Sequence, residues 1–149
     1  MDYKALTAQV KALTEGVPYE IANLANVSAV IWQEMKNINW AGFYLMQQGK
    51  LVLGPFQGKP ACIEIAVGKG VCGTAVQEKR TILVEDVHVF PGHIACDSAS
   101  ISEIVVPIFK NGTVYGVLDI DSPYLARFTA EDQTGLEMLV RELEHVLFG

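Results

Sequence analysis

An Asn-Gly pair constrains the fold of this chain more than any other feature of the sequence. It belongs to a four-residue segment, residues 110–113 (KNGT), that separates two short apolar segments, residues 103–109 (EIVVPIF) and 114–121 (VYGVLDID). Asn and Gly accept the positive φ angles of the tight turns that join antiparallel strands. The sequence therefore predicts a β-hairpin in the C-terminal half of the chain.

Helical periodicity flanks a central group of strand-like segments. Apolar residues at helical spacing predict a helix over residues 3–14, a second over about 19–35, and a last one after Thr129, a favourable N-cap. A helix of about two turns is expected over residues 74–80. Residues 47–49 (QQG) indicate a second hairpin, and short aromatic or β-branched segments predict further strands over 38–46, 50–56, 62–67 and 81–86. Helices at both ends of about six mostly antiparallel strands predict an α+β fold.

The composition favours one domain over residues 1–149. Half of the residues are hydrophobic, which is enough for a single core at this length. The net charge of −6 comes from scattered acids without a basic stripe, so neither nucleic acid nor an anionic membrane is an expected partner. No apolar run approaches the ~20 residues of a membrane span, and the first residues do not resemble a signal peptide. We therefore expect a cytoplasmic protein.

The three cysteines, Cys62, Cys72 and Cys96, would then lie in a reducing compartment, where a structural disulfide is not expected. Redox chemistry, metal binding and burial remain as roles. Cys96 lies in a long loop near His88 and His93, but the spacing H-x4-H-x2-C lacks the paired ligands of structural zinc sites, so we expect no metal there. An exposed loop gives a thiol no packing role, which favours chemistry at Cys96.

The glycine-rich segment of residues 68–73 (GKGVCG) matches the spacing G-x-G-x-x-G of dinucleotide-binding turns. The following helix is too short for the crossover of such a unit, and Glu64 interrupts the preceding strand, so we expect no bound cofactor. The glycines instead predict a tight strand-to-helix turn whose N–H groups could hold a small anion such as a carboxylate. Cys72 in this turn has two interpretations: a thiolate favoured by the helix N-terminus, or a small buried side chain.

Two acids, Asp119 and Asp121, are two residues apart in a predicted strand, so both side chains leave the same face about 7 Å apart. Such a pair is tolerated when a cation or a proton lies between the carboxyls. The alternative is that the strand has reached solvent and Asp121 begins an Asp-Ser-Pro turn.

The position of Glu103 depends on the register of the predicted hairpin. A two-residue Asn-Gly turn sets Glu103 opposite Ile120, whereas a three-residue loop over 110–112 sets it opposite Asp119. Of these two registers, only the second gathers three carboxyls on one face. A bulge near Pro107 could have the same result.

Trp40, Gly42 and Tyr44 alternate onto one face of an earlier strand. The absent side chain of Gly42 would leave a hollow between two aromatic rings, suited to a methyl group or a cation. Packing against a helix is the alternative.

Four segments together resemble the free methionine-(R)-sulfoxide reductase family, a branch of the GAF-domain fold. They are NWAGFYL, LGPFQGKPACIEIAVGKGVCGTA, VFPGHIACDSASISEIVVPI and GVLDIDSP, and the resemblance covers essentially the whole chain. It implies a GAF-like central six-stranded, mostly antiparallel sheet, with N- and C-terminal helices on one face and a ligand pocket on the other. The signature of cyclic-nucleotide GAF domains is absent.

The resemblance also implies a mechanism. Cys96 matches the catalytic cysteine, which attacks the sulfoxide sulfur and becomes a sulfenic acid. Cys62 matches the principal recycling cysteine, which would close a disulfide on Cys96, and Cys72 is a second candidate for that role. Thioredoxin would then reduce the disulfide from outside, with no bound cofactor and no metal.

By the same resemblance, Asp119 would bind the substrate ammonium, and Glu103 and Asp121 the polarised sulfoxide. Trp40 and Tyr44 match an aromatic wall around the S-methyl group. The rival hypothesis is a non-catalytic GAF module that senses a small molecule or an oxidant. The sequence leaves the oligomeric state open, a homodimer included.

Overall fold

The computed structural model describes residues 1–93 and 99–149, and this part of the chain forms an α+β fold. Its elements follow one another as α1 (Tyr3–Thr14), α2 (Glu20–Glu34), β1 (Trp40–Gln47), β2 (Lys50–Gly58), β3 (Glu64–Ala66), α3 (Gly70–Glu78), β4 (Ile82–Val84), a short 3-10 helix (Val87–Val89), β5 (Ser102–Lys110), β6 (Thr113–Ser122) and α4 (Ala130–Phe148). No helix in the described ranges is both long and apolar enough to cross a membrane.

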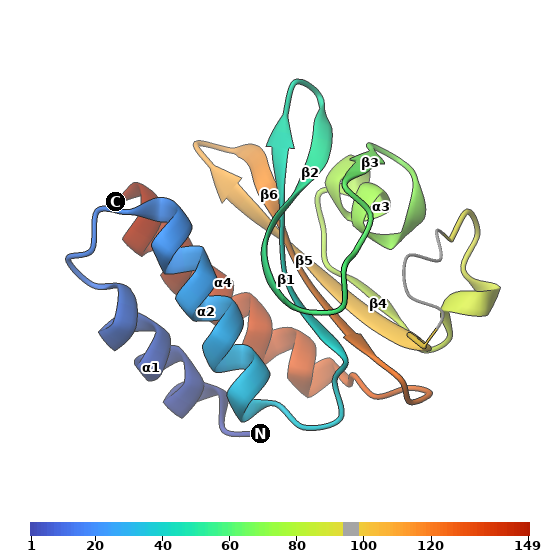
Figure 1. Ribbon diagram of the computed structural model, residues 1–149, viewed down its shortest axis with the longest axis horizontal. Helices are drawn as coiled ribbons and strands as arrows, with labels where there is room; N and C mark the ends of the chain where they lie inside the picture. The colour runs from blue at the N-terminus through green and yellow to red at the C-terminus, as the bar shows by residue number, and fades with distance from the viewer. Residues whose placement is uncertain (94–98) are drawn as a thin grey trace.

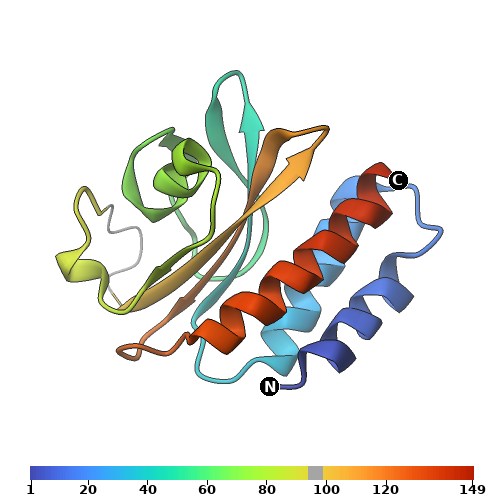
Figure 2. The same ribbon diagram turned by 180° about the vertical axis from the view of Figure 1, so that it is seen from behind.

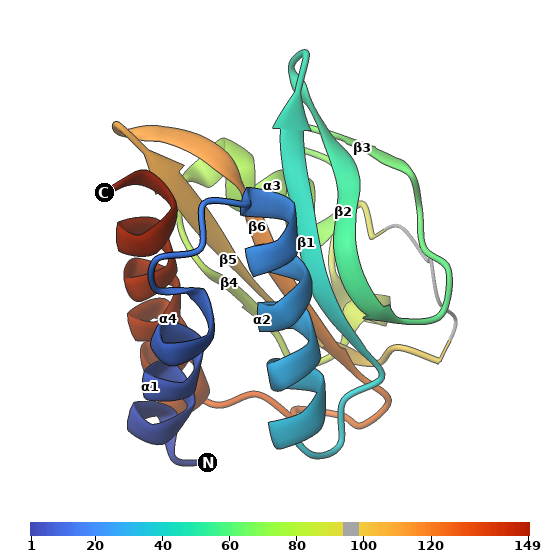
Figure 3. The same cartoon turned by 60° about the vertical axis from the view of Figure 1, so that its left-hand side comes forward.

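The six strands form one sheet in the order β3-β2-β1-β6-β5-β4, and every neighbouring pair is antiparallel. Helices α1, α2 and α4 lie on one side of this sheet and α3 on the other (Figures 1 and 2). Helix α2 packs on β1 and β2, α4 packs on β5, and α1 packs against both of these helices (Figure 3). The predicted GAF-like architecture is confirmed.

Helix α4 begins as the sequence predicts. The Thr129 hydroxyl accepts a hydrogen bond from the Asp132 amide, and the Asp132 carboxylate accepts one from the Thr129 amide, which makes a capping box. The Tyr3 hydroxyl also donates to Asp132, at 2.5 Å, which ties α1 to the start of α4. The core beneath these helices contains Leu6, Leu24, Ile31, Leu136 and Leu143.

Both predicted hairpins are present, and both have two-residue turns. Lys110 pairs with Thr113, and the residues between them, Asn111 and Gly112, have φ angles of 52° and 77°. Positive φ at both turn positions matches the right-handed twist of the flanking strands. The second hairpin turns at residues 48–49 in the same way. The alternative three-residue loop over 110–112 is therefore wrong.

The register of β5 on β6 changes close to this turn. Phe109 pairs with Val114 but Ile108 pairs with Gly116, so Tyr115 is an extra residue in β6. The shift sets Glu103 opposite Asp121, whereas the sequence predicted Ile120 or Asp119 as its partner. The predicted bulge near Pro107 is confirmed, because the register shifts between Ile108 and Phe109. A one-residue shift changes which face of the sheet Glu103 shares with the residues of β6, so Glu103 joins Asp119 and Asp121.

The glycine-rich segment does not form a dinucleotide-binding unit. Strands β3 and β4, before and after α3, lie at opposite edges of the sheet and are not parallel neighbours. Helix α3 begins at Gly70, four residues before the predicted start. The helix can begin this early because Gly73 has no side chain. A Cβ at this position would lie only 2.4 Å from the Ala66 carbonyl oxygen of the preceding turn. The two flanking strands have only three residues each, fewer than the six predicted for each.

Candidate active site

Three carboxyl groups meet on the face of the sheet that α3 covers. Glu103 on β5 pairs with Asp121 on β6, and Asp119 lies two residues before Asp121 on the same face. Glu103 and Asp119 are buried, with 8% and 5% of their surface exposed, and Asp121 is half-buried. The alternative in which this strand has simply reached solvent is wrong for Asp119.

Burial dominates the electrostatics of these acids. It raises the pKa of Asp119 well above its usual range, and the nearby carboxyls of Asp121 and Glu103 raise it further. Burial also raises the pKa of Glu103, although hydrogen bonds from Asp119, Asp121 and Cys72 act in the opposite direction. Asp119 Oδ1 is buried and has no hydrogen-bond partner among the described residues. These shifts favour the protonated forms of Asp119 and Glu103, and Asp119 Oδ1 offers a ligand a buried acceptor.

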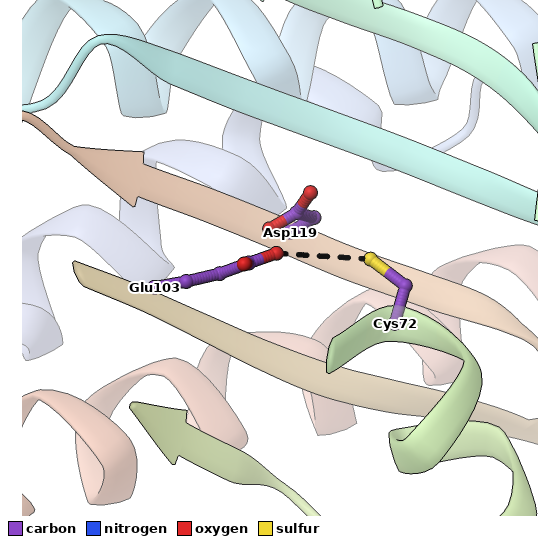
Figure 4. Close-up of side chains that lie close together, drawn as sticks. All are labelled: Cys72, Glu103 and Asp119. Atoms are coloured by element: carbon purple, nitrogen blue, oxygen red, sulfur yellow. Dashed lines mark hydrogen bonds between the residues drawn. The ribbon is translucent and has the colours of Figure 1, made fainter. Parts of the chain in front are cut away.

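Cys72 reaches this cluster from the first turn of α3. Its thiol is a hydrogen-bond donor to Glu103 Oε2 at 3.9 Å, and Asp119 lies beside the pair (Figure 4). Burial, followed by the charges of Asp119 and Glu103, raises the pKa of Cys72. The interpretation of Cys72 as a buried thiol is confirmed. Burial first, and the neighbouring carboxyls second, disfavour the thiolate of the other interpretation.

An aromatic wall stands beside the acids. The rings of Trp40 and Tyr44 stack with centroids 5.8 Å apart. Phe56 stacks on the Trp40 ring at 5.1 Å, and a Cβ at Gly42 would lie 2.2 Å from the Phe56 Cβ. Gly42 therefore allows β2 to approach, and the predicted hollow between the rings is wrong.

Hydrogen bonds fix both wall residues to the loop that precedes β3. Trp40 Nε1 donates to the Lys59 carbonyl at 3.1 Å, and the Tyr44 hydroxyl donates to the Cys62 carbonyl at 2.8 Å. Burial raises the pKa of Tyr44, so its hydroxyl remains a donor. The Tyr44 side chain therefore also fixes the backbone at Cys62.

A cavity of about 50 Å³ connects these groups, which is room for a few water molecules. It is lined by six of the predicted site residues and by a second set that the predictions did not include. The predicted ones are Trp40, Tyr44, Cys72, Glu103, Asp119 and Asp121; the others are Pro60, Ala61, Ile65, Lys69, Gly70, Val71, His93 and Ser100. Lys69 and the first residues of α3 had a sequence signal in the glycine-rich turn. Ser100 had none, because only the fold brings it here.

The first turn of α3 lines one side of the cavity. No described side chain caps this helix, and its first residues, Gly70, Val71 and Cys72, line the cavity. Gly70 donates its amide to the Gly92 carbonyl at 3.2 Å. The amides of Val71 and Cys72 lack an intrahelical acceptor, whereas the Gly73 amide donates to the Lys69 carbonyl at 3.0 Å. The Lys69 side chain adds positive charge.

The remaining predicted residues lie elsewhere. Cys62 is half-buried beside the cavity and packs on the wall. His88 pairs with Asp86 at the surface, with 2.9 Å between Nδ1 and the carboxylate. Cys96, the predicted nucleophile, and its neighbour Asp97 lie outside the described residues.

Comparisons with known proteins agree with this architecture. A GAF domain model matches residues 12–147. The free methionine-R-sulfoxide reductase of Escherichia coli K12 is 54% identical over 145 residues, which cover 97% of this chain and 88% of that protein. This chain belongs to the free methionine-R-sulfoxide reductase family of GAF domains. The family member of Saccharomyces cerevisiae is 47% identical over 91% of this chain and 80% of its own length.

Solved structures of this reductase family superpose closely on the chain. The fRMsr of Staphylococcus aureus, in complex with substrate, matches with a TM-score of 0.94 and 53% identity over 98% of this chain and 95% of that one. The free methionine-R-sulfoxide reductase of Neisseria meningitidis, also with its substrate, matches with a TM-score of 0.93 and 44% identity, covering 97% and 87% of the two chains. The likeness therefore extends over the whole fold that surrounds the cavity.

Proposed function

We propose that this protein reduces free L-methionine-(R)-sulfoxide to methionine. The observation that carries the proposal is the cluster of three carboxyls in one cavity with two aromatic rings. Membership of the reductase family supports the same activity. A sulfoxide sulfur is a poor electrophile until its oxygen accepts a proton or a short hydrogen bond, and a buried acid with a raised pKa supplies this.

The proposed reaction transfers the sulfoxide oxygen to a cysteine. The Cys96 thiolate attacks the sulfur, the S–O bond breaks, and methionine leaves while Cys96 becomes a sulfenic acid. A thiol of Cys62, or of Cys72 in its place, condenses with this acid, which forms a disulfide and releases water. A thioredoxin-type dithiol then reduces the disulfide by exchange. Such recycling needs a reducing compartment, for which we propose the cytoplasm.

Each group of the substrate has a matching wall in the cavity. Asp119 binds the ammonium, whose positive charge would lower the pKa of this carboxyl and favour its ionised form. The Asp119 Oδ1 atom, which has no partner among the described residues, accepts a hydrogen bond from the ammonium. Glu103 and Asp121 hold the sulfoxide oxygen, and Trp40 and Tyr44 surround the S-methyl group. The first turn of α3 with Lys69 receives the carboxylate.

This arrangement restricts the enzyme to the free amino acid. A peptide-bound methionine sulfoxide has an amide in place of the ammonium, so Asp119 would lose its cationic partner. Residues of the sheet and of the first turn of α3 line the cavity, and its volume is only about 50 Å³.

A coupled assay tests the proposal. Free methionine-(R)-sulfoxide is added to the protein with thioredoxin, thioredoxin reductase and NADPH, and NADPH absorbance is followed. We expect steady consumption with the R epimer, and none with the S epimer or with N-acetylmethionine-(R)-sulfoxide. A flat trace with the R epimer, while a known thioredoxin substrate is still reduced, would favour the non-catalytic sensor.

A further inference from the structure

Cys72, Glu103 and Asp119 present three ligand atoms to one point in the cavity. The thiol sulfur and one carboxylate oxygen of each acid lie within 4.8 Å of one another, and all three residues are buried. They come from three separate elements, α3, β5 and β6, so the packing of α3 on the sheet holds the arrangement together (Figure 4). The Cys72 sulfur lies 3.9 Å from Glu103 Oε2.

Asp119 gives a second sign that a ligand fits this point. Its Oδ1 atom is buried without a hydrogen-bond partner among the described residues, and 5% of the residue is exposed. A buried carboxylate oxygen without a donor is unfavourable, so a bound cation would offset that penalty. A water molecule could do so as well, but water has no preference for the sulfur atom on the other side.

The ligand types decide the class of cation. A thiolate sulfur favours zinc-class ions over magnesium or calcium, and carboxylate oxygens complete a mixed set that such ions accept. Zinc lies about 2.3 Å from sulfur and about 2.0–2.2 Å from oxygen, so tetrahedral ligand atoms are roughly 3.5 Å apart. Side-chain movements of about 1 Å or less would bring these three atoms to that spacing.

The other charged groups of the cavity fit a divalent cation unequally. Asp121 adds a further carboxyl and His93 an imidazole, and both line the cavity. Lys69 also lines it and opposes a cation. Two further possible ligands, Asp121 and His93, outweigh the single positive charge of Lys69, so the cavity as a whole favours a bound cation.

We propose that Cys72, Glu103 and Asp119 bind one thiophilic divalent cation of the zinc class in the cavity of the reduced protein. The thiol and the carboxyls give up their protons to the buffer as the ion enters. The same ion would occupy the place of the substrate ammonium and block the cavity. This competition rests on the proposed function, whereas the metal binding itself does not.

Cobalt(II) is the probe that tests the site. The double variant Cys62→Ser, Cys96→Ser leaves Cys72 as the one thiol of the chain, and its reduced form is titrated with CoCl2. We expect a sulfur-to-cobalt charge-transfer band that saturates at one ion per chain and disappears when ZnCl2 is added. No band, or a band that the triple variant with Cys72→Ser retains, would overturn the proposal.

Acid variants of the same double variant show whether an acid is a metal ligand or only adds negative charge to the protein. Asp119→Asn should weaken cobalt binding at least about tenfold. Glu15→Gln removes one exposed acid at the end of α1 and should leave the affinity unchanged. Equal weakening by both would count against the site. Circular dichroism identifies any variant that fails to fold, and for such a variant Glu103→Gln takes its place with the same expectation.

A final titration tests the shared cavity. Methionine, the proposed product, should lower the apparent affinity for cobalt in proportion to its concentration. If methionine binds by calorimetry but leaves the cobalt band unchanged, the competition is refuted. If methionine does not bind at all, the proposed function is in doubt, while the cobalt band still decides the metal site.

Discussion

Glu103 on β5 lies directly opposite Asp121 on β6, and one extra residue in β6 is responsible. Without Tyr115 in the register, Glu103 would lie opposite Ile120, which faces the core under the helices. A one-residue slip moves a side chain to the other face of a sheet. The bulge beside the hairpin turn therefore decides that three acids share one cavity.

Glu103→Gln tests the role of the acid in this pair. The amide keeps the shape of the side chain but cannot transfer a proton, so we expect the first release of methionine to slow by roughly 10² to 10⁴-fold. The measurement is single-turnover methionine release under quenched-flow conditions. Glu15→Gln, which removes the same charge from an exposed position, should match the unmodified protein. A rate loss below tenfold for Glu103→Gln would move the proton donor to Asp121.

The cysteine variants separate the nucleophile from the recycling thiol. Cys96→Ser should abolish even the first stoichiometric release of methionine, because the serine hydroxyl is far less nucleophilic than a thiolate. Cys62→Ser should permit that one release but slow thioredoxin-dependent turnover. Release retained in Cys96→Ser would assign the attack to Cys72. Unchanged turnover in Cys62→Ser would assign the recycling to Cys72.

Tyr44→Phe should affect recycling more than chemistry. The Tyr44 hydroxyl donates to the Cys62 carbonyl, and such a bond is worth about 0.5–1.5 kcal/mol. Its loss loosens the backbone at Cys62 but leaves the aromatic ring against the cavity. We expect a turnover rate with thioredoxin that falls a few-fold, and a single-turnover release near that of the unmodified protein. A larger effect on the single turnover would show that the hydroxyl contacts the substrate.

Gly42→Ala should destabilise the fold. The added Cβ would lie 2.2 Å from the Phe56 Cβ and 2.6 Å from its Cα, and backbone atoms cannot move aside as a flexible side chain would. Overpacking of this kind costs roughly 1–3 kcal/mol of unfolding free energy. Urea denaturation gives the value, and Gly112→Ala is the control, because its Cβ meets no atom within 4 Å and only its φ of 77° is unfavourable. Equal costs would show that β2 can move away from β1.

Local patterns in the sequence account for most of the fold. The two hairpin turns need residues that tolerate positive φ. Asn111, Gly112 and Gly49 are such residues, and they predict both turns. Thr129, as a favourable N-cap residue, predicts the start of α4. These signals depend on neighbouring residues alone, so one sequence suffices to read them.

The candidate site was harder to predict because it depends on distant segments. Nothing around Tyr115 marks it as the bulged residue, so the partner of Glu103 was predicted wrongly. The same holds for Cys72, whose pKa is raised first by burial and then by acids 31 and 47 residues away in the sequence. The approach of Phe56 to Gly42 likewise follows from the pairing of β1 with β2. The residues around Gly42 alone predicted a hollow between two aromatic rings, because they do not show which strand packs there.

Asp119→Asn should make the protein more stable and less active. Asp119 is buried beside two other carboxyls, and its pKa is raised in the folded state above the usual value of about 3.9. A group with a raised folded-state pKa contributes its full stability below the unfolded pKa and loses it as the pH rises through the folded pKa. Asparagine has no proton to lose, so the stability gain of the variant should be near zero at pH 4 and grow toward pH 8.

Thermal unfolding of both proteins between pH 4 and pH 8 gives the measurement. We expect a measurable gain at the upper end, because each pKa unit between the folded and unfolded states corresponds to about 1.4 kcal/mol. Methionine binding by calorimetry should weaken at least about tenfold, since the ammonium loses its carboxylate. A variant that is less stable at every pH would mean that the Asp119 carboxylate is held by partners in the folded state, and its assignment to the ammonium would fall with that result.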